Sequence, residues 1–349
     1  MTLAMGFNER LIFMKWIKIF TFGFSFFLYG LLFISTNGVA GENRLRVYVT
    51  NFEGEKISVI DLADQKEIAQ IETGKNPHGV VIAPDGSEVY VTNEGDGTLS
   101  FINPQDNKVT KTIQVGHHPQ QPAISSDGIT LYVPLNADHA IAIVNTKEKK
   151  LKSTLPVGRN PHIIIASPTS KRIYVTSEGD MKVVVVNTEA NRVEKDIPLW
   201  AWPRVPSVTP DGKTLFQTIR WLNGALAVDL EKGEIVNWIS LDEPKAFPKQ
   251  GMVAHGLRVT PDGKELWLTT QLNNQVTILD AHTFQTLATL LVGKNPNWIE
   301  FTPDGQTAVI SNTSSDTVSL INTKSRSVSK TIPVVKSPKR LAVGFVKMD

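Results

Sequence analysis

The chain has 349 residues and no cysteine, which excludes disulfides, thiolate metal ligands, cysteine nucleophiles and lipoprotein acylation. Its 36 basic and 34 acidic residues nearly balance, so a dominant surface for nucleic acid or anionic lipid is not expected. Its length alone would suggest two or three domains, but an internal repeat runs through nearly all of it.

The first forty residues predict an export signal. Lys15 and Lys18 precede an uncharged run, residues 19–40, that is rich in Phe and Leu and ends in small residues. Signal peptidase accepts such an end, so we expect a Sec-type signal peptide over residues 1–40, cleaved after Ala40. The mature chain, residues 41–349, would be periplasmic or secreted, with 33 basic and 33 acidic residues. An uncleaved membrane anchor is the alternative, because the run is just long enough to span a bilayer.

A turn-forming tripeptide returns at a nearly fixed interval along the rest of the chain. The copies are Pro84-Asp85-Gly86, Ser126-Asp127-Gly128, Pro168-Thr169-Ser170, Pro210-Asp211-Gly212, Pro261-Asp262-Gly263 and Pro303-Asp304-Gly305. Successive steps are 42, 42, 42, 51 and 42 residues. A repeat in the forties indicates one supersecondary unit copied around a ring or along a solenoid.

Each repeat predicts four short strands. In the unit that contains Pro84, the apolar run 79–83 leads into the tripeptide turn, and the β-branched and aromatic run 89–93 follows it. The loop 94–97 separates that run from an alternating strand, 98–102, and residues 109–115 form the fourth strand. The second strand recurs in seven copies, at 47–51, 89–93, 131–133, 173–176, 215–217, 266–268 and 308–310. We therefore predict an all-β fold, a seven-bladed β-propeller with four antiparallel strands per blade.

The two ends of the mature chain predict how the ring closes. The repeat region begins with a second strand at Arg46 and finishes with a lone first strand, residues 340–345. We expect this C-terminal strand to become the innermost strand of the blade whose other strands come from residues 46–73. Such closure removes the exposed edge that an open ring would leave.

The strands alternate in direction, so the connections of each blade fall on two faces. The tripeptide turns and the third-to-fourth turns share one face, the turn face. There each third strand ends in an Asx residue: Asp61, Asn103, Asn145, Asn187, Asp229, Asp280 and Asn322. A side-chain acceptor at that place initiates a turn, so we interpret the turn face as structural.

The opposite face, the loop face, varies from blade to blade. Just inside each first strand stands a polar residue: His78, Gln120, His162, Arg204, His255, Asn297 and Lys339. First strands line the central channel, so these seven positions should surround one mouth of it. Imidazoles can hold a transition metal or exchange protons, with Glu94 or Glu178 as base or partner, and Arg204 and Lys339 could hold an anion. The structural alternative is that each histidine bonds a loop carbonyl of the next blade.

One sector of the loop face departs from the repeat. The longer step carries a nine-residue excess within residues 242–252, Trp200 and Trp202 replace the usual loop before a first strand, and Arg220-Trp221-Leu222 replaces an Asn-Glu-Gly loop. Departures from a repeat on loops often carry function. These aromatic residues would either pack the insertion or form a ligand or partner site. The candidate binding residues are Trp200, Trp202, Arg204, Trp221, Phe247, His255, Trp298 and Lys339.

Several strings resemble a known family. YVTN at 48–51 and 90–93, YVTS at 174–177, NPHGVVIAPDG at 76–86 and VAHGLRVTPDG at 253–263 are similar to the YVTN family of bacterial exported β-propellers. The resemblance covers residues 46–345 and implies the fold without an activity. Relatives by fold include cell-envelope repeat proteins, a haem-bearing nitrite reductase propeller, amine dehydrogenase subunits and streptogramin lyases.

The function we expect is that of an exported binding or scaffold propeller, which holds a protein partner or small molecule of the cell envelope on its loop face. The alternative is an enzyme or accessory protein in which His78, His162 and His255 hold a divalent metal ion or haem-type cofactor. A surface or adhesion repeat protein is a third possibility. We expect a monomer without nucleic-acid binding and without a membrane span in the mature chain. No HExxH, G-x-S-x-G or phosphate-loop motif occurs.

Overall fold

The computed structural model describes residues 43–241 and 254–348, which belong to one compact unit, Ala40–Asp349. The predicted signal peptide, the whole insertion at 242–252 and with it the candidate residue Phe247 lie outside the described residues. Within the described ranges there is no helix at all, and so none that is long and apolar enough to cross a membrane.

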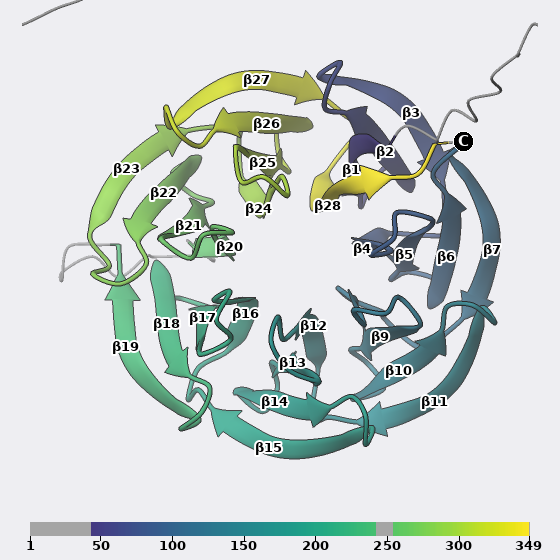
Figure 1. The fold of residues 1–349 in the computed structure, drawn as a ribbon, viewed down its shortest axis with the longest axis horizontal. Coiled ribbons are helices and arrows are strands. Elements are labelled where there is room, and N and C mark those ends of the chain that lie inside the picture. Colours follow the sequence, from purple (N-terminus) through teal and green to yellow (C-terminus); the bar gives the residue numbers. More distant parts are fainter. Residues whose placement is uncertain (1–42, 242–253, 349) are drawn as a thin grey trace, which may run out of the picture. The chain divides into compact units, whose positions relative to one another are not determined.

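Seven four-stranded antiparallel sheets surround a central channel, as the sequence predicts (Figure 1). Four of the blades, innermost strand first, are β28 (Pro338–Val346), β1 (Arg44–Asn51), β2 (Lys56–Asp61) and β3 (Lys66–Glu72); β4 (Pro77–Ile82), β5 (Val89–Asn93), β6 (Thr98–Asn103) and β7 (Lys108–Gln114); β8 (Ala123–Ile124), β9 (Thr130–Leu135), β10 (Ala140–Asn145) and β11 (Lys150–Pro156); β12 (Pro161–Ala166), β13 (Arg172–Ser177), β14 (Lys182–Asn187) and β15 (Arg192–Pro198).

The other three blades continue the ring. They are β16 (Pro203–Val208), β17 (Thr214–Ile219), β18 (Gly224–Asp229) and β19 (Glu234–Ser240); β20 (Ala254–Val259), β21 (Glu265–Thr270), β22 (Gln275–Asp280) and β23 (Thr286–Leu291); β24 (Pro296–Phe301), β25 (Thr307–Asn312), β26 (Thr317–Asn322) and β27 (Ser327–Pro333).

The hydrophobic core lies between neighbouring blades rather than at the centre of the ring. Second and third strands are almost fully buried, while fourth strands such as β7 and β11 are largely exposed. Tyr90 and Phe101 meet edge to face at 5.5 Å, and both pack in one cluster with Leu131 and Leu135 of the next blade. Each blade therefore needs its neighbour to cover its apolar face.

The YVTN strings have a physical reason in this fold. The hydroxyl of Thr92 donates to the carbonyl of Gln120 in the next blade and accepts from the backbone amide of Gly79. Asn93, the next residue, donates to Ser100 on the neighbouring strand. The threonine thus ties the second strand to the first strand of its own blade and to the segment before β8 in the next, and the asparagine ties it to the third strand.

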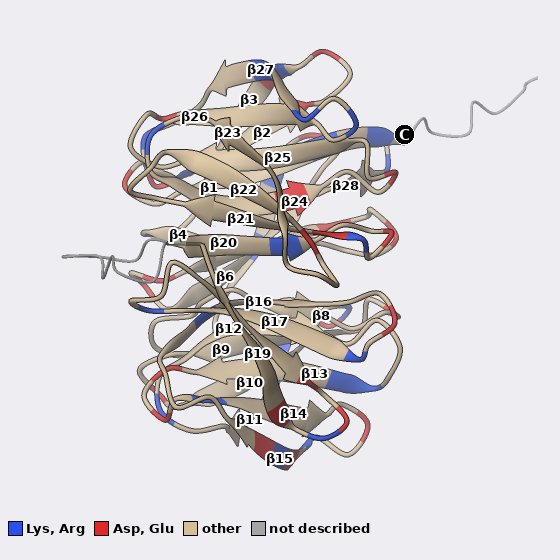
Figure 2. Cartoon of the chain, turned by 90° about the vertical axis from the view of Figure 1, so that its left-hand side faces the viewer, with Lys and Arg blue, Asp and Glu red and all other residues tan. Residues whose placement is uncertain are grey.

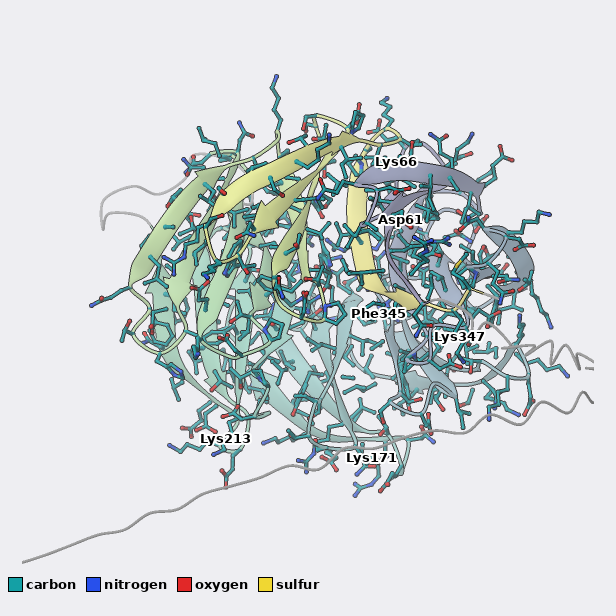
Figure 3. The ribbon with its side chains drawn as sticks, turned by 45° about the horizontal axis from the view of Figure 1, so that its top comes forward. Asp61, Lys66, Lys171, Lys213, Phe345 and Lys347 are labelled. Carbon is teal, nitrogen blue, oxygen red and sulfur yellow. The ribbon has the colours of Figure 1, made fainter. Side chains whose placement is uncertain are left out.

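Closure of the ring is confirmed. β28 pairs antiparallel with β1, with Val47 opposite Val343 and Tyr48 opposite Ala342. The two strands are slightly longer than predicted, beginning at Arg44 and ending at Val346. Beyond β28, the amide of Lys347 donates to Gly86, which anchors the C-terminal end to the next blade. Figure 3 shows Phe345 and Lys347 at this end of β28.

The first strand of one blade is shorter than the repeat predicts. β8 keeps only Ala123 and Ile124, and proline alone is not the reason, because β16 has Pro203 and Pro206 at the positions of Pro119 and Pro122 and still has six residues. Gln121, just before Pro122, instead pairs with Ile163 of the next blade.

The Asx turns are formed in all seven blades. In each, the Asx Oδ1 accepts a backbone amide two or three residues on, as from Ala63 to Asp61 and from Gln105 to Asn103. Figure 3 shows Asp61 and Lys66 beside one such turn. Charged residues of both signs are mixed along the turns and loops (Figure 2).

Candidate functional site

The loop-face mouth of the channel is closed by polar side chains. Of the seven predicted positions, His78, Gln120, His162, His255 and Asn297 are buried, while Arg204 and Lys339 are partly exposed. The rings of His78 and His162 lie 5.7 Å apart although their blades are not adjacent. The first strands thus bring these positions together, as predicted, but most of them face one another rather than solvent.

Arg340 occupies the centre of this mouth, although it is not among the site residues predicted from the sequence. Its side chain is fully buried (0 % exposed), and Nη1 donates to Asn297 Oδ1 at 2.9 Å. Its Nη2 lies 3.3 Å from Nε2 of His162, which is three blades away, so the side chain crosses the channel. The sequence feature that could have identified Arg340 is its charge. The other blades have an uncharged residue at that position: Gly79, Gln121, Ile163, Val205, Gly256 and Trp298.

Glu178 links two of the predicted residues. Its Oε1 lies 2.8 Å from His162 Nδ1 and accepts from Arg204 Nη1 at 2.5 Å. Burial lowers the pKa of His162 to about 4, although Glu178 opposes this shift. Burial alone would raise the pKa of Glu178, but His162 and Arg204 together lower it to about 2. Because His162 is neutral at pH 7, the ion pair there is that of Arg204 with Glu178.

The other two histidines are also buried, and one of them, His255, makes a structural contact with the next blade. Burial holds the pKa of both His78 and His255 well below the usual value, and nearby cations add to the effect, Lys339 first for His78 and Arg340 first for His255. His255 Nδ1 lies 2.8 Å from the carbonyl oxygen of Asn297 in the next blade. This is the structural alternative that the sequence offered.

The mouth does not fit the predicted metal site of His78, His162 and His255. In the described ranges, no group of three or more His, Asp or Glu side chains is placed to hold a metal ion. His255 is directed to a carbonyl, and His162 lies between Glu178 and Arg340. A cation at this place would also meet the buried guanidinium of Arg340, which lacks a carboxylate within ion-pair distance among the described residues.

The aromatic candidates divide into two groups. Trp200 and Trp221 are 81 % and 53 % exposed on the loop face, and the Arg220 guanidinium lies 4.7 Å from the Trp202 ring and 4.9 Å from the Trp221 ring. With Met181, whose carbonyl accepts from Leu199, these residues form what we call the tryptophan sector: Met181, Trp200, Trp202, Arg220 and Trp221.

Trp298 does not belong to this group. It is buried in β24, in a blade separated from β16–β19 by the blade β20–β23, and its indole N–H donates to Glu300. Lys339 belongs to the closing blade, where its Nζ lies 3.8 Å from the Phe52 ring centroid. The sequence placed Trp298 on the loop face of a neighbouring blade, but its side chain lies inside the channel wall.

A pair of linked replacements creates the tryptophan sector. Three other blades have glycine at the position of Trp200 and an aspartate on the adjacent loop. The aspartate accepts a hydrogen bond from the backbone amide of the residue after that glycine, as Asp180 does from Arg159 at 2.9 Å. A Cβ at Gly158 would lie only 2.5 Å from that Asp180 carboxylate. In the blade β16–β19 the aspartate is replaced by Leu222, so the obstacle to a side chain at position 200 is absent.

Both exposed tryptophans have left-handed backbone conformations, with φ of 56° for Trp200 and 73° for Trp221. Such angles are uncommon for large side chains and cost of order 1–3 kcal/mol each. Two positions whose backbone conformation suits glycine are therefore occupied by exposed tryptophan.

Comparison with known proteins supports the fold. Residues 38–196 match the family model of YNCE-like β-propellers, which agrees at a coarse level with the YVTN resemblance. No curated protein sequence matches the chain significantly.

Similar solved structures include Kuenenia stuttgartiensis hydrazine synthase (TM-score 0.73, 22 % identity, 79 % of this chain and 92 % of that one) and the Pseudomonas aeruginosa periplasmic gluconolactonase PpgL (0.72, 20 %, 87 % and 99 %). The dihydro-heme d1 dehydrogenase NirN, solved in complex with DHE, is also similar (0.62, 18 %, 85 % and 74 %). At these identities the likeness shows the propeller fold alone.

Proposed function

We propose that this chain is a non-catalytic propeller of the cell envelope that binds a protein partner through the tryptophan sector of its loop face. The observation that carries the proposal is the exposure of Trp200 and Trp221, where no other described blade has an aromatic residue and most have glycine, alanine or serine. The exceptions are Val335 at the first position and Glu53 and Leu272 at the second. Export rests on the signal peptide expected over residues 1–40.

The composition of the sector suits a protein interface. Tryptophan and arginine are the residues that most often dominate binding energy at interfaces. Arg220 is already stacked between Trp202 and Trp221, so little conformational entropy remains to be lost on binding. Met181 adds a flexible apolar side chain that can adapt to a partner.

The backbone supports the same proposal. Trp200 and Trp221 are held at φ values that disfavour large side chains, and a strained, exposed residue is more readily explained by binding than by stability. A backbone hydrogen bond holds the loop in place, because the amide of Arg220 donates to the carbonyl of Trp202. The amide of Glu94 donates to the carbonyl of Asn76 in the same way in the blade β4–β7.

The test begins with the full chain expressed in its host, cross-linked in the envelope and purified so that the partner can be identified. The affinity of the purified pair is then measured for the native protein and for Trp200→Ala/Trp221→Ala. We expect the double variant to bind at least tenfold more weakly, with an unchanged thermal transition.

Trp238→Ala is the matched control. Trp238 is 57 % exposed, like Trp221, but lies on the outer strand β19 rather than on the loop face. It should leave the affinity unchanged. Equal affinity of the native protein and the double variant, or equal losses in both variants, would contradict the proposal.

A second candidate is an enzymatic or enzyme-accessory role at the channel mouth. The contact of Glu178 with His162 favours it, because a neutral imidazole that a carboxylate holds in place can accept a proton. A gluconolactonase among the similar structures suggests a lactone as the first substrate to try, by analogy of fold. Turnover that Glu178→Gln abolishes would support this role, and absence of turnover by the native protein would count against it.

A further inference from the structure

The half of the channel nearer the turn face contains a cavity. It has a volume of ≈ 300 Å³, and residues from the first strands of all seven blades line it. At the turn end of these strands Ile82, Ala166 and Val343 are partly exposed, whereas His162, near the loop end, is buried. The cavity therefore opens toward the turn face, and Trp298 lines its inner part.

The wall of the cavity is apolar except for Gln121, whose side-chain amide donates to the Val80 carbonyl, and one charged pair. At one level of the first strands, the residues in successive blades are Val81, Ala123, Ile165, Ser207, Arg258, Glu300 and Ala342. All of these except Ser207 line the cavity. Two neighbouring blades thus place an ion pair where the rest of the ring has small or apolar side chains.

The ion pair is fixed but not sealed off. The Arg258 guanidinium donates to Glu300 Oε1, and the Trp298 indole N–H donates to the same oxygen at 3.1 Å. The side chains of Arg258 and Glu300 are 19 % and 23 % exposed. Burial raises the pKa of Glu300, against the effect of Arg258.

A second cation lies behind the same indole. The ring centroid of Trp298 is 5.6 Å from the Arg258 guanidinium and 4.3 Å from that of Arg340. Around the inner part of the cavity there are thus two guanidinium groups and one carboxylate. An anionic ligand is favoured over a cationic one by this balance.

We propose that this cavity binds a small monocarboxylate with an apolar tail. The carboxylate would pair with Arg258, which can offer two parallel N–H donors, and the tail would lie against Ile82, Ile165 and Val343. A volume of ≈ 300 Å³ is at the lower end of small-molecule sites, which restricts the tail to a short chain. The site is separate from the tryptophan sector and does not depend on the function proposed for it.

The mechanism of recognition is an exchange of partners. The ligand carboxylate competes with Glu300 for Arg258, so Glu300 weakens binding in the native protein. Removing the Glu300 charge while retaining its shape should therefore strengthen the interaction.

The experiment measures the affinity of octanoate, 1-octanol and octylammonium for the full mature chain by titration calorimetry. We expect octanoate to bind best and octylammonium least. Glu300→Gln should bind octanoate at least fivefold more tightly than the native protein. Arg258→Gln/Glu300→Gln should lose at least tenfold relative to Glu300→Gln, while the affinity for octanol stays the same.

The double variant is used because Arg258→Gln alone would leave a buried carboxylate without its partner. Ala342→Leu, which narrows the cavity, should weaken binding of all probes while its thermal transition shows that it is folded. Equal affinity for octanoate and octanol, weaker octanoate binding by Glu300→Gln, or unchanged octanoate affinity in Ala342→Leu would overturn the proposal, as would absence of octanoate binding to the native protein.

Discussion

The blades β4–β7 and β16–β19 have the same four strands and differ in their loops. In the first, Asp96 accepts from the amide of Lys75, and a glycine, Gly74, leaves room for the carboxylate. In the second, Leu222 and Trp200 stand at those two positions, and the tryptophan is exposed. The hydrogen bond from Glu94 to Asn76 in the first blade is retained as that from Arg220 to Trp202 in the second.

This difference separates two kinds of information in the sequence. Residues that follow the repeat account for strand pairing, turns and packing between blades. Residues that depart from it, such as Trp200 and Leu222, are not needed by the scaffold, since other blades fold with glycine and aspartate there. The departures are therefore where a binding function is most readily sought.

The largest effect is expected from removing what both blades depend on, the closed ring. Deleting residues 338–349 removes β28 and exposes the edge of β1 and the core face of β4–β7. We expect loss of the cooperative thermal transition measured by circular dichroism. A truncated chain with a normal transition would show that closure by β28 does not hold the ring together.

The buried histidines at the start of β4, β12 and β20 predict a large loss of stability in acid. Because burial lowers the pKa of His162 to about 4, the unfolded chain takes up the proton first as the pH falls. The stability from this residue is fully present above pH 6.5 and is lost as the pH approaches 4, a change of about 3 kcal/mol.

Urea unfolding at pH 7, 6, 5 and 4.5 measures this loss. His162→Gln is the informative variant, since Gln120 shows that glutamine fits the equivalent position in another blade. Its stability should fall less steeply with acid than that of the native protein. Parallel pH profiles for the two proteins would contradict the assignment of a buried neutral imidazole.

A smaller effect on stability should come from giving the blade β4–β7 the kind of loop residues found in the blade β16–β19. A Cβ at Gly74 would collide with Asp96 and with Asn93, so Gly74→Ala should cost about 1–3 kcal/mol. In the Asp96→Leu background the same substitution should cost about 1 kcal/mol less, because one of the two obstacles is gone. A double-mutant cycle by urea unfolding gives the coupling, and strict additivity would break the proposed link between the two positions.

Much of the fold could be predicted because the same pattern of strands and turns occurs in seven copies along the sequence. The strand order, the Asx turns that begin at residues such as Asp61, and closure of the ring are all confirmed. The short strand β8 was not predicted, because the pairing of Gln121 with Ile163 of the next blade has no local sequence pattern.

The candidate site was less predictable, because it depends on contacts across the ring. Arg340 contacts His162, which lies three blades away, and a contact between such distant positions cannot be predicted from a local sequence pattern. Trp298 was assigned to the loop face from its place beside Asn297, whereas its side chain packs between Arg258 and Arg340 inside the channel wall. The Arg258–Glu300 pair was visible only as a departure within the first strands.

The most direct test of the central claim is to restore the repeat in the blade β16–β19. Trp200→Gly/Trp221→Gly/Leu222→Asp gives this blade the loop residues of β4–β7, and the affinity of the purified partner is then compared with that of the native protein. We predict at least a tenfold loss of affinity with a thermal transition that is unchanged or higher, because the left-handed residues become glycine. Unchanged affinity in a folded variant would contradict the claim that the departures from the repeat carry the binding function.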